Sequence, residues 1–125
     1  MRRFLAALLL LATPAAAQDA GGLWKTQVSK KGGWLHVRIA PCAADVAKTC
    51  GLIAEAFKTE VIDLVGQEII SDMDPDGPGK WSGGRVWAPD DDKSYNSNME
   101  LHGEVLTVEG CVLFVCRDQN WTRVN

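Results

Sequence analysis

The side chains of this chain best suited to contact another molecule are aromatic, and they gather in one segment. Trp81, Arg85 and Trp87 are spaced so that an extended strand would place all three on one face. Facing inward, and joined by Tyr95, they would line a pocket for a small apolar or aromatic ligand. Facing outward, they would pack on the outside or contact a protein partner. Gly83-Gly84, in the same segment, indicates a β-bulge or a close backbone approach.

Two other groups of residues could support chemistry, and we interpret both as structural. The stretch Asp72–Gly77 begins like a calcium-binding loop, with three carboxylates at alternate positions. However, Gly83 stands where an EF-hand loop carries its bidentate glutamate, so a solvated turn is the simpler interpretation. His36 and His102 have no neighbouring nucleophile, and no nucleophile-elbow or zinc-protease spacing is present. We therefore expect no metal, no cofactor and no enzymatic activity.

Four cysteines, Cys42, Cys50, Cys111 and Cys116, allow three disulfide pairings. We favour the two local pairs, Cys42 with Cys50 and Cys111 with Cys116. Each would close a short loop and stabilise the fold by about 2–3 kcal/mol in the chain-entropy model. The alternative is a metal site of four thiolates, but zinc ligands of one pair are commonly only about 2–4 residues apart, which Cys42 and Cys50 are not.

The first residues predict export from the cytoplasm. A basic start, Met1-Arg2-Arg3, precedes the apolar run Phe4–Ala12 and the small residues of Thr13–Ala17, which is the organisation of a secretory signal peptide. The apolar run is shorter than the ~20 residues of a membrane-spanning helix. We therefore expect cleavage after residue 17 and one soluble domain over residues 18–125, in a compartment that permits disulfides.

The charge of the expected mature chain excludes two classes of partner. Without residues 1–17, 11 Lys and Arg face 16 Asp and Glu, a net charge of −5. Proteins that bind nucleic acids or anionic membranes need a basic surface to pair with phosphates. We expect neither partner.

The elements that would position these residues are short β-strands. Runs of β-type composition alternate with turn signals such as Lys31–Gly33, Asp76–Gly79 and His102-Gly103, and no helical period is sustained. Residues 42–50 could form a helical turn inside the first disulfide loop, and residues 58–66 favour neither a strand nor a helix. About eight strands in up-and-down order are predicted, at residues 22–28, 34–40, 51–58, 66–72, 80–88, 93–101, 104–112 and 120–124. Eight strands can close into a barrel that is filled by side chains or holds one small ligand.

Residues near the two ends of the expected domain are suited to close such a barrel. Gly22 and Trp24 lie on the first predicted strand, and Trp121 and Arg123 lie on the last. The ring of Trp24 and the guanidinium of Arg123 can stack as a cation–π pair worth about 0.5–2 kcal/mol. We assign these four residues to barrel closure.

The sequence resembles a bacterial secreted family known as domain of unknown function 2147. The resemblance rests on Gly22–Thr26, Val37–Ile39, Cys42, Cys50-Gly51, Lys80–Asp90, Lys93–Tyr95, Leu106–Cys111 and Gln119–Val124. It implies a lipocalin-like antiparallel barrel in the periplasm or outside the cell of a Gram-negative bacterium. It implies no established activity and no catalytic residues.

Together these observations predict a secreted, disulfide-bonded barrel that binds a small apolar or aromatic ligand. The predicted lining residues are Trp81, Arg85, Trp87 and Tyr95. The alternative is a protein-interaction module of the cell envelope that uses an exposed aromatic strand face and encloses no ligand.

Overall fold

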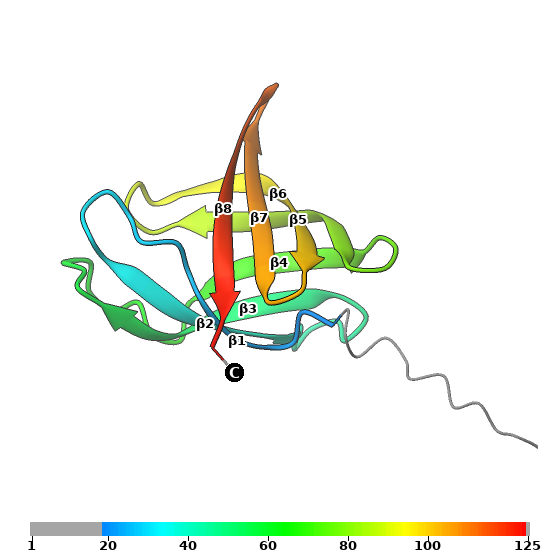
Figure 1. The fold of residues 1–125 in the computed structure, drawn as a ribbon, viewed down its shortest axis with the longest axis horizontal. Coiled ribbons are helices and arrows are strands. Elements are labelled where there is room, and N and C mark those ends of the chain that lie inside the picture. Colours follow the sequence, from blue (N-terminus) through cyan, green and yellow to red (C-terminus); the bar gives the residue numbers. More distant parts are fainter. Residues whose placement is uncertain (1–18, 125) are drawn as a thin grey trace, which may run out of the picture.

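The computed structural model describes residues 19–124, and these form one antiparallel sheet that closes on itself as a barrel (Figure 1). The predicted signal peptide, residues 1–17, lies outside the described residues. Neighbouring strands follow chain order around the barrel: β1 (Gly22–Lys25), β2 (Trp34–Pro41), β3 (Thr49–Phe57), β4 (Glu68–Pro75), β5 (Lys80–Ala88), β6 (Lys93–His102), β7 (Val105–Val112) and β8 (Val115–Arg123). Between residues 19 and 124, no helix is long and apolar enough to cross a membrane.

The predicted fold class, an up-and-down barrel of eight strands, is confirmed. One strand differs clearly from the prediction, because β8 begins at Val115 and not at residue 120. The helical turn considered for residues 42–50 is also wrong. There, the N–H of Cys42 donates to the carbonyl of Lys48 at 2.9 Å, and Thr49 already belongs to β3.

A hydrophobic core fills part of the barrel interior with large side chains. Alternate residues of the strands point inward, which places the apolar members of each strand in contact with one another. The largest fully buried core residues come from six of the eight strands: Trp24, Val37, Ile39, Ile53, Ile70, Met73, Leu106 and Trp121.

The barrel closes where β1 meets β8, and the paired region is short. Only Trp24 with Arg123 and Lys25 with Thr122 stand opposite each other there. The Arg123 guanidinium lies 4.4 Å from the centre of the Trp24 ring, which is fully buried. Its nitrogens donate to the carbonyls of Gly21 at 2.9 Å and Asp19 at 3.2 Å. One side chain therefore holds the first strand, the last strand and the segment before β1 together.

Both local disulfides are present. Cys42–Cys50 joins the end of β2 to the start of β3, and Cys111–Cys116 links β7 to β8 beside their connecting turn. No cysteine among residues 19–124 is free. Because all four sulfurs are covalently paired, the alternative of a four-thiolate metal site is wrong.

A bulge in β5 changes which side chains face the interior. The register between β5 and β6 shifts between Trp81 and Gly84, and Gly83 has a φ of 72°. A Cβ at Gly84 would lie 2.5 Å from the carbonyl oxygen of Ser71, so this position faces inward against β4. As a result Trp81 is buried while Arg85 is exposed. The prediction that Trp81, Arg85 and Trp87 share one face is wrong, because the bulge interrupts the alternation.

The contact between β1 and β8, which we call the seam, yields a stability prediction for Arg123. We expect Arg123→Ala to lower the free energy of unfolding by about 1–2 kcal/mol, since it removes the stacking and two hydrogen bonds. Urea denaturation measures the change. Arg38→Ala, which removes an exposed arginine on β2, is the control and should stay close to the unchanged protein. Equal stability of the two variants would refute the role given to the seam.

The bulge yields a second stability prediction. Gly84→Ala should destabilise the barrel by about 1–3 kcal/mol, because the new methyl group overlaps a backbone carbonyl that cannot move freely. The control is Gly21→Ala, whose Cβ would first meet the flexible Asp19 carboxylate at 3.4 Å. Thermal unfolding of both variants provides the comparison. A tolerated Gly84→Ala would mean that β4 and β5 do not approach as closely as described.

Candidate ligand-binding cavity

The barrel interior is open at one end, where it contains a cavity of about 590 Å³. Its mouth is surrounded by residues from the connections between β1 and β2, β3 and β4, and β5 and β6, and by Val112 and Val115, the strand residues on either side of the turn between β7 and β8. In an up-and-down barrel these three connections and the turn between β7 and β8 lie at the same end. The cavity therefore occupies the open half of the interior, beyond the core.

The inner wall of the cavity is apolar and continuous with the core. Residues that belong both to the core and to the cavity wall are Leu35, Leu64, Ile69, Val108 and Trp121. The Trp121 side chain is 1% exposed, and its indole N–H donates to the Oε1 of Gln119 at 3.0 Å. The rigid ring therefore forms part of the boundary between packed core and open cavity.

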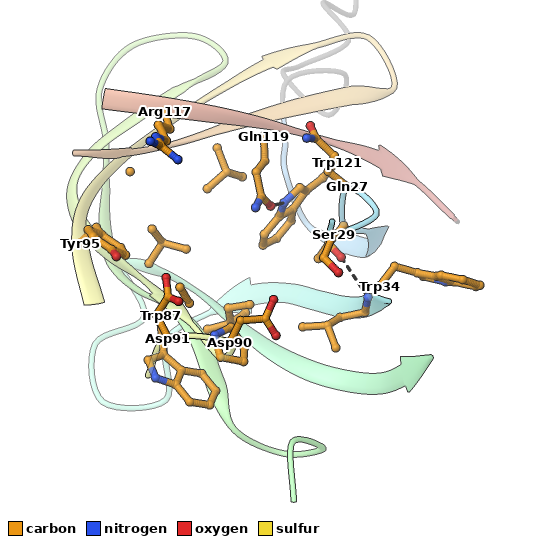
Figure 2. A pocket seen from close by; sticks show the side chains of 18 of the residues that line it. Gln27, Ser29, Trp34, Trp87, Asp90, Asp91, Tyr95, Arg117, Gln119 and Trp121 are labelled. Carbon is orange, nitrogen blue, oxygen red and sulfur yellow. Dashed lines mark hydrogen bonds between the residues drawn. The ribbon is translucent and has the colours of Figure 1, made fainter. Parts of the chain in front are cut away.

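Strand β8 supplies one wall of the cavity, because every second side chain of this strand points inward. Val115, Arg117, Gln119 and Trp121 all line the cavity, and Figure 2 shows the last three on this strand. The intervening residues lie on the outer face, where the Oγ of Thr107 bonds to Asn120 at 2.9 Å. The alternation was visible in the sequence. It was missed because the predicted strand began at residue 120.

Several polar side chains of the lining already bond to the backbone. The Thr26 hydroxyl accepts from the N–H of Leu35 at 2.9 Å, and the Ser29 hydroxyl accepts from the N–H of Gly33 at 3.2 Å. The Gln27 Oε1 accepts from the N–H of Asn120 at 3.0 Å, which ties the chain after β1 to β8. These three side chains hold the wall in shape.

The charged residues of the lining are found near the mouth. Asp90 and Asp91 come from the connection between β5 and β6, and Arg117 comes from β8 (Figure 2). All three are exposed. None of the ion pairs among residues 19–124 includes Arg117. Its guanidinium is the cationic group that the wall offers to a ligand.

The four predicted lining residues do not all reach the cavity. Trp87 and Tyr95 line it, and the Trp87 indole N–H donates to Asp92 at 2.9 Å. Trp81 is packed in the core instead. Arg85 lies on the outer surface, where it donates to the Oδ1 of Asn96 at 3.0 Å. The bulge in β5 explains the position of both.

The placement of the aromatic residues also bears on the alternative of a protein-interaction module. Trp81 is 8% exposed, and Trp87 packs against the core. Strand β5 therefore does not present the exposed aromatic face on which that alternative depended.

The remaining residues considered for chemistry lie away from the cavity. His36 packs edge-on against Phe57 at 4.7 Å between ring centres, with Glu55 at 3.5 Å. Asp72 and Asp74 are on the outer side of β4, while Met73 between them is fully buried. The stretch interpreted as a solvated turn thus lies largely within a strand.

Comparisons with known proteins agree with this architecture. Residues 22–123 match a protein family described as "Uncharacterized protein conserved in bacteria", DUF2147. Protein HP1028 from Helicobacter pylori, described as belonging to the lipocalin family, has a similar structure with a TM-score of 0.69. The two share 14% sequence identity, and the match covers 86% of this chain and 84% of that chain. No curated protein sequence matches this chain.

At this identity the structural likeness concerns the fold alone. The family match covers nearly all of the described strands. The chain therefore belongs to the bacterial DUF2147 family, and it folds as a lipocalin-like barrel of eight strands.

Proposed function

We propose that this protein binds one small molecule with a large apolar part in the open half of its barrel. The observation that carries the proposal is the apolar-walled cavity of about 590 Å³. Ligand sites typically have volumes of about 300–1,000 Å³, with mostly apolar walls and a few polar groups. An interior intended only for stability would be filled by side chains, because empty apolar space costs free energy.

The residues that line the cavity indicate which end of this ligand would point inward. The deep wall offers aliphatic and aromatic side chains such as Ile69, Val108 and Trp121, which suit an acyl chain or a ring system. Arg117, which has no ion-pair partner among residues 19–124, stands near the mouth. A ligand with an acidic head group would therefore bind with its apolar part inward and its anion beside Arg117, to which guanidinium groups bond well.

We propose binding rather than catalysis because the polar side chains of the wall have structural partners. Thr26, Gln27 and Ser29 accept hydrogen bonds from backbone N–H groups. The two disulfides fit a compartment outside the cytoplasm. For a bacterial chain with the predicted signal peptide, the periplasm is the location we propose.

Blocking the cavity tests this function. Gly110 lies on β7 between two lining residues, and its Cβ would lie 3.3 Å from Val86 and 3.5 Å from Tyr95. Gly110→Phe should place a ring inside the cavity and weaken binding of a fluorescent lipophilic probe by at least about tenfold. Glu109→Phe adds the same ring one residue away on the outer face and should leave binding unchanged.

Both variants should keep their disulfides and their β-sheet circular dichroism. Unchanged probe affinity in a folded Gly110→Phe protein would contradict the proposal. Equal losses in both variants would show that the probe binds elsewhere.

The head-group preference is tested at Arg117. We expect Arg117→Gln to weaken binding of a long-chain fatty acid about three- to tenfold, a modest effect because the group is exposed and screened by solvent. The alcohol of the same chain length should bind both proteins equally. Isothermal titration at fixed salt measures the four affinities. An equal effect on acid and alcohol would rule out a direct contact with the anion.

A further inference from the structure

The connection between β7 and β8 carries the most exposed apolar side chains at the open end of the barrel. We refer to Val112–Val115 as the apolar finger. Phe114 is 99% exposed and Leu113 is 88% exposed, and the flanking Val112 and Val115 are more than half exposed. Figure 1 shows this hairpin extending well beyond the neighbouring strands. Side chains of this kind are normally removed from water.

Folding alone does not account for the residues at the tip. Val112 pairs with Val115, so Leu113 and Phe114 form a two-residue turn. Leu113 has a φ of 54°, a left-handed conformation that glycine or asparagine adopts at lower cost. A turn selected for stability would carry one of those residues. Leu113 therefore stands where the backbone conformation disfavours it, beside the fully exposed Phe114, which points to a contact outside the chain.

The finger is narrow and uncharged. The Cys111–Cys116 disulfide clamps its base. Between Gly110 and Cys116 no residue carries a charge. A finger of four residues is far below the roughly 20–30 residues per partner of a stable protein interface. A lipid bilayer, in contrast, can take up a narrow apolar projection without a complementary surface.

The finger is also continuous with the cavity. Val112 and Val115 line the cavity with one part of their surface while remaining exposed. A second loop at the same end, between β3 and β4, exposes Ile62 by 77% and Val65 by 64%, and its Leu64 lines the cavity. Exposed apolar side chains thus flank the mouth through which a ligand would pass.

We propose that the apolar finger inserts into an uncharged, zwitterionic lipid bilayer and brings the cavity mouth to the membrane surface. This inference rests on the proposed binding function and names a membrane as the source or destination of the ligand. The net charge of −5 expected once residues 1–17 are removed, and the acidic Asp90–Asp92 loop at the same end, argue against an anionic surface.

Flotation with phosphatidylcholine vesicles tests the insertion. The oxidised protein should float with the vesicles, and the double variant Leu113→Gly/Phe114→Ser should lose at least about tenfold in partitioning. Val46→Ser is the matched control, because Val46 is 78% exposed on the loop between β2 and β3 at the other end of the barrel. It should float like the unchanged protein.

The single variant Leu113→Gly separates membrane contact from folding. Glycine suits the positive φ, so this variant should be at least as stable as the unchanged protein while floating less. Loss of flotation without loss of stability supports the proposal. Unchanged flotation of the double variant overturns it, and so does a dimer of the unchanged protein that the double variant converts to monomer.

A transfer assay distinguishes this inference from the proposed function. In vesicle-free solution the double variant should bind a fluorescent fatty acid with unchanged affinity. From phosphatidylcholine vesicles it should take up the same probe several times more slowly. If the protein binds the probe but never floats, the membrane inference fails and the binding function stands. If it floats but binds no probe, the binding function fails.

Discussion

The contact between Trp24 and Arg123 lies where the first and last strands of the barrel meet. Strand β1 has four residues, and only two of them pair with β8. Such a short ladder has few backbone hydrogen bonds, so the stacked guanidinium and its bonds to Gly21 and Asp19 carry much of the closure. An unclosed sheet would expose two edges to pairing with other chains.

Closure is also what creates the candidate site. Strand β8 contributes Arg117, Gln119 and Trp121 to the cavity wall, and Gln27, just after β1, bonds to the backbone of β8. If β8 separated from β1, the cavity would lose its charged wall and open to water along its side. The contact between β1 and β8 is therefore part of the architecture, and it keeps the wall of the candidate cavity in place.

The barrel interior is divided between a packed core and the candidate cavity. Large side chains such as Trp24, Ile70 and Trp81 fill the half beyond the cavity, where Gly84 allows β5 to approach β4 closely. The open half is left unfilled, and small residues such as Gly110 help to keep it so. The packed half of the interior stabilises the fold, whereas the half with the cavity lacks the side-chain contacts of a filled core.

The sequence predicted the strand order and both disulfides because these depend on local patterns. Turn residues, alternation and cysteine spacing all act over a few positions. The cavity lining was predicted only in part. Whether a strand residue points into the barrel depends on bulges and strand register, which the alternation of residue types does not show. The bulge at Gly83-Gly84 was anticipated, but its effect, turning Arg85 outward and Trp81 inward, required the register with β6. Arg117 was not predicted to line the cavity because β8 begins earlier than expected. Val115 and Arg117 are exposed residues, which a simple burial pattern assigns to a loop.

The proposed function requires that the open half of the barrel hold a small apolar molecule. Native mass spectrometry detects such a molecule in protein purified without denaturation and then incubated with a bacterial lipid extract. We predict one small molecule per chain, released at low collision energy from a protein with both disulfides intact. A protein that stays at its ligand-free mass before and after incubation would contradict the account.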